Sequence, residues 1–186
     1  MNNFYKHPTS IIEKNVSIGN KSKIWHFTHI MKNVCIGNNC IIGKNVFIGE
    51  NVKIGNNCKI QNNVSIFDGV VLKDDIFCGP SCVFTNVKNP RAFIEQKNKF
   101  LNTIIQSGVT IGANSTIVCG NTVSEYAFIG AGSVVTKNIQ KFALVYGNPA
   151  KKVGWVSKNG CKLDNSLTCP RDNSQYVLKN NQLELK

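Results

Sequence analysis

The stretch from residue 30 to residue 66 decides the fold, and it reads IMKNVCIGNNCIIGKNVFIGENVKIGNNCKIQNNVSI. An isoleucine stands at every sixth position of this stretch, from Ile30 to Ile66. A period of six fits neither a 3.6-residue helix nor the two-residue alternation of a simple strand. It matches the hexapeptide repeat of a parallel β-helix, in which each repeat forms one side of a three-sided coil. The pattern therefore predicts an all-β fold with the isoleucines inside.

The same period continues on both sides of this stretch. Large residues hold the repeat position at Ile12, Ile18, Ile24, Leu72, Cys78 and Phe84, and a second phase occupies Ile105, Ile111, Ile117, Val123, Ile129 and Val135. Three repeats make one coil of about 18 residues, so these repeats predict about six coils. Glycine and asparagine follow many repeat positions, and both tolerate the positive φ angles of tight corners.

The two phases are out of register, because the interval from Phe84 to Ile105 is not a whole number of hexapeptides. We therefore expect an extruded loop at about residues 87–103, and loops on a rigid scaffold often carry function. The predicted organisation is a β-helix at residues 1–140, including this loop, and a small C-terminal extension at residues 141–186.

The composition excludes several classes of protein. The net charge is +12, but the basic residues are spread along the chain without interleaved aromatic residues, which argues against nucleic-acid binding. No window approaches the roughly 18 apolar residues of a membrane span, and the N-terminus lacks the apolar stretch of a signal peptide. Four of the eight cysteines (Cys40, Cys58, Cys78 and Cys82) occupy inward positions, which favours free thiols in a reducing cytoplasm. Cys161 and Cys169 have no second pair nearby, so we expect no metal.

Several segments resemble one family. They are Gln61–Ile66, Phe77–Ser81, Phe84–Arg91, Ile111–Asn114, Glu125–Thr136 and Gly147–Ala150. Together they are similar to the 3-N-acetyltransferases of nucleotide-linked amino sugars. The short Asn89-Pro90-Arg91 loop and Cys169-Pro170 in the tail look most like the branch that acts on UDP-2-acetamido-3-amino-2,3-dideoxy-glucuronate for bacterial surface polysaccharides. The resemblance implies a left-handed coil, acetyl-coenzyme A as co-substrate, and a homotrimer with active sites between subunits.

The resemblance also implies a catalytic role for Asn86, whose side-chain carbonyl would accept a hydrogen bond from the sugar amine. Asp68 lies three hexapeptides earlier, one coil away, and is the rival candidate as a general base. His26 and His29 lie more than three coils from Asn86, about 15 Å along the axis. A general base must lie within about 3 Å of the proton that it abstracts, so neither histidine is expected to serve as one.

The coenzyme is expected on a column of small residues. Ala113 and Ala131 are separated by three hexapeptides, so they stack on one corner, flanked by Gly112 and Gly132. By resemblance, Pro149, Ala150, Lys151 and Lys152 would cover the adenine and the phosphates. The expected substrate-binding residues are Asn62, Asn63, Arg91 and His26; among them the arginine is suited to a carboxylate or phosphate.

Three alternatives remain open from the residues alone. A dTDP-3-amino-3,6-dideoxyhexose N-acetyltransferase would share the same coils. A non-enzymatic β-helix could serve as an assembly module, although it would not need the loop after Phe84. A zinc enzyme of the γ-carbonic anhydrase type would need a different histidine spacing from that of His26 and His29. Two residues, Asn121 and Ser124, depart from the family pattern of an aliphatic residue and then glycine. Asn121 falls on an inward position, where a buried amide needs a hydrogen-bond partner.

Overall fold

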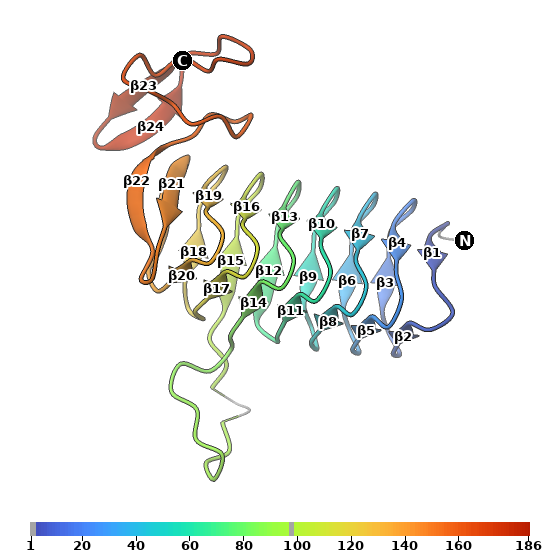
Figure 1. The fold of residues 1–186 in the computed structure, drawn as a ribbon. Helices are drawn as coiled ribbons and strands as arrows, with labels where there is room; N and C mark the ends of the chain where they lie inside the picture. The colour runs from blue at the N-terminus through green and yellow to red at the C-terminus, as the bar shows by residue number, and fades with distance from the viewer. Residues whose placement is uncertain (1–2, 97–98) are drawn as a thin grey trace.

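A computed structural model describes residues 3–96 and 99–186. Within these ranges the regular elements are strands, most of them two residues long, and they succeed one another along a single axis (Figure 1). No helix in the described part of the chain is long and apolar enough to cross a membrane. The predicted all-β class with a parallel β-helix is confirmed.

The strands form three sheets, one on each side of the coil, and a separate hairpin. Sheet A contains β1 (Tyr5–Lys6), β4 (Lys23–Ile24), β7 (Ile41–Ile42), β10 (Lys59–Ile60), β13 (Phe77–Cys78), β16 (Thr110–Ile111), β19 (Phe128–Ile129), β21 (Ala143–Tyr146) and β22 (Lys151–Trp155). Sheet B contains β2 (Ile11–Ile12), β5 (His29–Ile30), β8 (Phe47–Ile48), β11 (Ser65–Ile66), β14 (Val83–Phe84), β17 (Thr116–Ile117) and β20 (Val134–Val135). Sheet C contains β3 (Ser17–Ile18), β6 (Cys35–Ile36), β9 (Lys53–Ile54), β12 (Val70–Leu72), β15 (Thr103–Ile105) and β18 (Thr122–Val123). The hairpin pairs β23 (Tyr176–Lys179) with β24 (Gln182–Leu185).

Neighbouring coils are in register at an interval of three hexapeptides, as the sequence period predicts. Lys59 pairs with Ile41 on one side and with Phe77 on the other. The residue after each of these pairing positions points inward, and Ile42 and Ile60 are fully buried. Each coil therefore buries its apolar side chains against one another and against the coils directly above and below it.

Polar side chains stabilise the corners. Asn56 Oδ1 accepts a hydrogen bond from the backbone N–H of Asn38 at 2.9 Å, and Asn38 Oδ1 accepts one from Asn20 at 2.7 Å. The next residue along, such as Asn39 or Asn57, adopts a φ of 57°. The asparagines thus satisfy backbone donors that the two-residue strands leave unpaired.

The inward cysteines take over the role of serine in the core. Ser22 Oγ donates to the carbonyl of Gly37 at 2.9 Å, and Cys40 and Cys58, one and two coils later, donate through Sγ to carbonyls at 3.1 Å. All eight cysteines of the chain are free thiols. The prediction that Cys40, Cys58, Cys78 and Cys82 are buried is confirmed, since each is 0% exposed.

The solenoid is longer than the predicted six coils. In the described residues, sheet A contains eight strands in parallel register, because β1 and β21 extend the stack at its two ends. β1 keeps the spacing of the repeat but lacks its large apolar residue, and β21 departs from the spacing. Lys6 stands at an inward position that the open end leaves uncovered, and the interval from Ile129 to its partner Val145 is shorter than three hexapeptides.

A small extension closes the C-terminal end (Figure 1). β22 turns back antiparallel to β21 and ends sheet A. A second apolar cluster follows, formed by Phe142, Leu163, Cys169, Tyr176 and Leu183. This cluster packs the hairpin β23–β24 beside the end of the solenoid.

The extruded loop leaves the solenoid after β14 and projects away from it (Figure 1). Phe84 pairs with Ile117, so the insertion makes the interval between these partners longer than the usual three hexapeptides. The backbone N–H of Leu101 donates to the carbonyl of Asn86 at 3.0 Å and closes the base of the loop. Thr103, the last residue of the predicted loop, already belongs to β15. Lys97 and Asn98, also within the predicted loop, lie outside the described residues.

Candidate active site

The two candidate catalytic residues stack on the corner that follows sheet B. Ile66 pairs with Phe84, so Asp68 and Asn86, each two residues further on, occupy the same place in adjacent coils. His26 lies on a different corner and three coils earlier, since it follows β4. The spacing predicted for these residues therefore matches the structure.

Asp68 is partly occupied by a structural role. Its carboxylate lies directly over Gly49, in the space that a Cβ atom there would need, and accepts a hydrogen bond from the backbone N–H of Glu50. Burial raises the pKa of the Asp68 carboxyl above its ordinary value, and the nearby Glu50 charge adds to the rise. Asp68 therefore caps its corner as the asparagines of other corners do.

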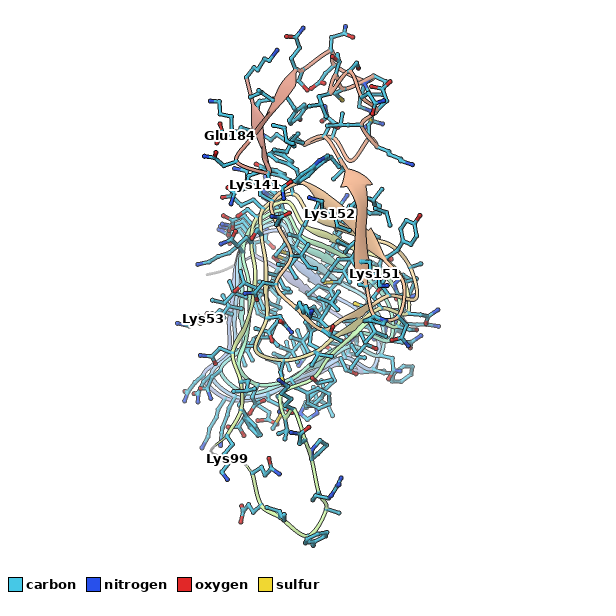
Figure 2. The ribbon with its side chains drawn as sticks, turned by 90° about the vertical axis from the view of Figure 1, so that its left-hand side faces the viewer. Lys53, Lys99, Lys141, Lys151, Lys152 and Glu184 are labelled. Carbon is cyan, nitrogen blue, oxygen red and sulfur yellow. The ribbon has the colours of Figure 1, made fainter. Side chains whose placement is uncertain are left out.

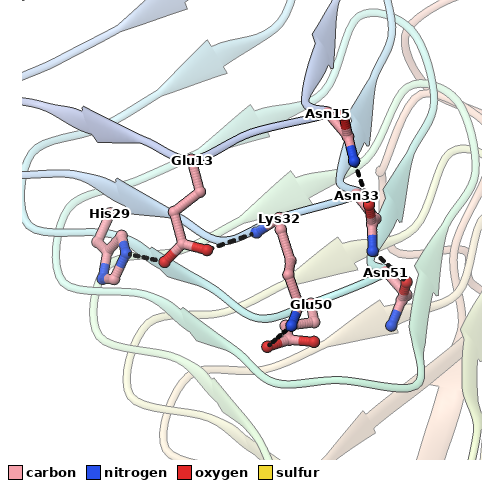
Figure 3. A network of polar contacts seen from close by, with 7 residues as sticks. All are labelled: Glu13, Asn15, His29, Lys32, Asn33, Glu50 and Asn51. Carbon is pink, nitrogen blue, oxygen red and sulfur yellow. Dashed lines mark hydrogen bonds and ion pairs between the residues drawn. The ribbon is translucent and has the colours of Figure 1, made fainter.

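A polar network occupies the earlier coils of the same corner (Figure 3). Glu13 bonds His29 Nε2 at 2.9 Å and accepts from the backbone N–H of Lys32 at 3.0 Å. The Lys32 ammonium in turn pairs with Glu50 at 3.3 Å. His29 thus has a carboxylate partner remote from Asn86, in keeping with the exclusion of a histidine base.

Asn86 differs from the corner asparagines of the earlier coils. Its side chain is half-buried and makes no hydrogen bond to any described residue, whereas the side-chain carbonyls of Asn56 and Asn62 each accept one from the coil below. The backbone of Asn86 is fixed by the bond from Leu101 at the loop base. A fixed backbone with a free amide is the arrangement that a ligand-binding asparagine requires.

The small residues predicted to bind the coenzyme converge on the corner that follows sheet A. A Cβ atom on Gly112 would lie 2.7 Å from Ala131 Cα, so glycine allows the two coils to approach. Gly132 has a φ of +68° and open space around it. Ala113 and Ala131 occupy the same position in adjacent coils, since Ile111 pairs with Ile129.

The Gly147–Ala150 turn lies beside these residues. The Val134 N–H donates to the carbonyl of Gly147 at 2.9 Å, and Ala150 donates back to the carbonyl of Val134 at 2.8 Å. The Asn148–Pro149 peptide bond is cis. Pro149 and Ala150 are therefore held next to the Ala131 corner.

The two lysines of β22 have different surroundings (Figure 2). Lys152 Nζ lies 3.8 Å from the centre of the Trp155 ring and donates to Gln140 at 3.1 Å, so it covers the end of the solenoid. Lys151 is exposed and pairs with Tyr146, which is also exposed. Of the two, Lys151 is the one free to contact a bound molecule.

The predicted substrate residues lie in two places. Asn62 accepts from the backbone of Lys44 at 2.9 Å, and Asn63 accepts from the Asn45 amide at 3.0 Å, so both stabilise corners after sheet A. His26 lies on the same corner. Arg91 lies on the extruded loop, exposed, and donates to the carbonyl of Pro90 at 3.3 Å.

Within one chain the candidate catalytic and coenzyme-binding residues lie on two different corners of the coil. Pro80, on the coenzyme corner, is one hexapeptide from Asn86, which follows the next side of the coil and lies at most about 20 Å away. The described residues contain no group of three histidine, cysteine or acidic side chains that could hold a metal. Asn121, flagged from the sequence, has a partner: its amide donates to the carbonyl of Val118 at 2.7 Å.

His26 and Asn62, both predicted to bind substrate, line a groove whose other residues the sequence analysis did not single out. It lies where Gly43 stands between Trp25 and Gln61 in one column of the solenoid. The signal was present in the sequence, since these residues follow one another at intervals of three hexapeptides. The column of Trp25, Gly43 and Gln61 points outward, away from the isoleucines, so the hexapeptide period does not distinguish it from other surface positions.

Comparisons with known proteins agree with this description. The bacterial transferase hexapeptide (six repeats) model matches residues 15–50 and 36–68, and the hexapeptide repeat of succinyl-transferase matches residues 102–137. A curated relative, dTDP-3-amino-3,6-dideoxy-alpha-D-galactopyranose 3-N-acetyltransferase of Aneurinibacillus thermoaerophilus, is 47% identical over 168 residues, which cover 89% of this chain and 86% of the relative.

Two solved structures share the fold at low identity. A hexapeptide transferase family protein from Anaplasma phagocytophilum matches with a TM-score of 0.57 and 19% identity, over 84% of this chain and 81% of the other. A mutant of AntD, an N-acyltransferase from Bacillus cereus solved with dTDP and coenzyme A, matches with a TM-score of 0.52 and 18% identity, over 82% and 80%.

Proposed function

Because this chain belongs to the hexapeptide-repeat N-acetyltransferases of nucleotide-linked amino sugars, we propose that it acetylates the 3-amino group of a dTDP-linked 3-amino-3,6-dideoxyhexose. The acetyl donor is acetyl-coenzyme A. The observation that carries the proposal is the 47% identity to an enzyme of that name along nearly the whole chain. As an enzyme of this family, the protein is not the non-enzymatic assembly module that the sequence left open.

The choice of sugar differs from the one that the sequence favoured. The UDP-linked uronate was preferred on the short loop around Arg91 and on Cys169-Pro170 in the tail, but the full-length relative supports the dTDP-linked alternative better. Cys169 is fully buried and donates to Ser157 Oγ at 3.2 Å. Its contacts therefore lie within the packing of the C-terminal extension.

The chemistry follows from the free Asn86 amide. A sugar amine resembles an α-amino group, with a pKa near about 8, so an appreciable fraction is unprotonated at neutral pH. The Asn86 carbonyl accepts a hydrogen bond from this amine and orients its lone pair toward the thioester carbon. The C–N bond forms, the C–S bond breaks, and the amine proton passes to the departing thiolate. Backbone N–H groups stabilise the oxyanion. Asp68 is the rival base, although one of its oxygens already accepts a corner hydrogen bond.

A homotrimer would complete the site. The outward strand residues of sheet B, among those described, include no lysine, arginine, aspartate or glutamate; they are Ile11, His29, Phe47, Ser65, Val83, Thr116 and Val134. Sheets A and C, in contrast, expose Lys23, Lys59 and Lys53. Packing sheet B against neighbouring copies about a three-fold axis brings the Asn86 corner of one subunit near the Ala131 corner of the next.

The test is a direct assay of the purified protein with acetyl-coenzyme A and each amino sugar in turn. We expect kcat/KM for the dTDP-3-amino-3,6-dideoxyhexose to exceed that for the UDP-linked uronate by at least about 100-fold, a difference of roughly 2.7 kcal/mol in transition-state binding. A preference for the UDP substrate would return the assignment to the other branch. Turnover of neither sugar would refute the proposed substrate class.

A further inference from the structure

The groove at Gly43 is a hollow of about 310 Å³ on the corner after sheet A. It arises because the column one residue after the repeat position has Gly43 between two long side chains, Trp25 and Gln61. No residue with a side chain fits at position 43, because a Cβ atom there would lie 2.8 Å from the backbone nitrogen of Asn62. The groove therefore results from the way the coils stack, and it is present before any ligand binds.

One wall of the groove is aromatic. The Trp25 side chain is 37% exposed, and its ring is nearly parallel to that of His26, with an interplanar angle of 7°. His26 is in turn stacked on His7, with ring centres 3.4 Å apart. These contacts hold the wall in place, and an exposed, oriented indole is a surface on which a planar base can stack.

The remaining lining is polar and positively charged. Gln61 makes no side-chain hydrogen bond among the described residues, so its amide can both donate and accept. The imide edge of thymine or uracil, with an N–H between two carbonyls, is complementary to such an amide. Lys44 is exposed and has no ion pair in the described chain, and no aspartate or glutamate lines the groove. An anionic ligand is favoured here.

The position of the groove matches the length of the substrate. Gly43 and Gly79 occupy the same column two coils apart, so the groove lies about 10 Å along the axis from the coil that carries Asn86. Further along the same corner come Gly112 and Ala131, which are proposed to hold the coenzyme. Asn86 of the same chain lies on the next corner, but in the proposed trimer the Asn86 corner of one subunit lies near this corner of its neighbour. A nucleoside diphosphate in the groove then extends along the axis toward that amine.

We propose that this groove binds the nucleoside diphosphate part of the nucleotide sugar. Trp25 stacks on the base, Gln61 pairs with its imide edge, and Lys44 neutralises the diphosphate. The inference rests on the proposed function for the identity of the sugar, but binding of the nucleotide is measurable without turnover. The corner after sheet A then carries both substrates in line, with the nucleotide toward the N-terminus and the coenzyme toward the C-terminus.

Intrinsic fluorescence tests the binding directly. The chain has two tryptophans, Trp25 and Trp155, and the second lies at the opposite end of the solenoid. In a Trp155→Phe variant, whose folding is checked by circular dichroism, titration with dTDP should quench the remaining emission with saturation. Isothermal titration of dTDP into the unmodified protein should give the same Kd. Absence of both signals would overturn the inference.

Kinetics distinguish this inference from the proposed function. Trp25→Ala and Lys44→Ala should each raise KM for the nucleotide sugar by about tenfold, with kcat and the KM for acetyl-coenzyme A within about twofold. Trp25→Phe keeps a stacking surface and should lose less than Trp25→Ala. Lys53→Ala, an exposed lysine on sheet C, is the matched control and should change neither constant.

Failure of the groove assignment and failure of the proposed reaction give different results. If the protein acetylates the dTDP sugar but Trp25→Ala and Lys44→Ala leave KM unchanged, the groove assignment is wrong and the function stands. If dTDP quenches Trp25 but neither sugar is acetylated, the groove is a nucleotide site and the proposed reaction is wrong.

Discussion

Asn86 is the residue on which the proposed chemistry depends. Its amide makes no hydrogen bond to the described protein, so Asn86→Ala removes no contact that supports the fold. We expect kcat to fall by on the order of 100-fold or more, because orientation of the amine is lost. The melting temperature should stay within a degree or two. Steady-state kinetics and thermal unfolding of the same preparation measure both quantities.

Asn56→Ala is the matched control for that variant. Asn56 Oδ1 accepts from the backbone N–H of Asn38, so its loss should lower stability by about 1 kcal/mol and leave kcat unchanged. A near-normal kcat for Asn86→Ala, together with loss of activity in Asp68→Asn, would transfer the catalytic role to the carboxylate.

Asp172 makes the stability of the C-terminal extension dependent on pH. Its carboxylate interacts with Cys169, accepts from Ser174 Oγ at 2.8 Å and accepts from the Asn159 amide at 2.6 Å. The adjacent Cys169 side chain, followed by the hydrogen bonds from Ser174 and Asn159, lowers the pKa of the Asp172 carboxyl to about 2. The charged form is therefore favoured in the folded state. The charged Asp172 side chain therefore stabilises the extension at pH values above the ordinary carboxyl pKa, and this stabilisation is lost as the pH falls from about 4 toward 2.

Asp172→Asn should accordingly destabilise the extension at neutral pH and flatten its pH dependence between about 4 and 2. Hydrogen exchange of the β23–β24 hairpin at a series of pH values measures the effect. The same acid sensitivity in the variant and in the unmodified protein would show that another group is responsible.

At the scale of the coil, glycine is required where backbones meet. A Cβ atom on Gly112 would press against the backbone of Ala131. A Cβ atom on Gly132 would enter open space, so the only cost of a side chain there comes from its positive φ. Gly132→Ala should cost about 1–2 kcal/mol from the left-handed backbone conformation. Gly112→Ala should cost more, because the next coil must move. Urea unfolding of both variants measures the two costs, and an equal or reversed order would contradict the packing argument.

The sequence predicted the coils because each buries a large side chain at a fixed period. It did not predict β1 and β21, since an end coil is covered on one side only and Lys6 can occupy an inward position there. It placed Asn86 and Asn62 correctly on their corners. Which of the two amides is free depends on hydrogen bonds between coils, and the period carries no information about those bonds.

For the whole molecule, the candidate site is divided between two edges of sheet B. Asn86 lies at one edge, and Ala113 and Ala131 lie at the other. The solenoid between the two corners is filled with buried side chains, so the two corners keep their separation within one chain. We propose that each site is completed by a neighbouring subunit, and mixing defective chains tests this proposal.

Asn86→Ala and Ala131→Trp should each abolish most activity, the first by removing the residue that orients the amine and the second by filling the coenzyme corner. If each site takes Asn86 from one subunit and Ala131 from the next, co-expression of the two variants regenerates intact sites. Random assembly should restore about a quarter of normal activity, because each half of a site is intact with an even chance. The same variants purified separately and mixed without subunit exchange serve as the control and should stay inactive. Sites contained within one chain would give no recovery after co-expression, and that result would refute the shared-site trimer.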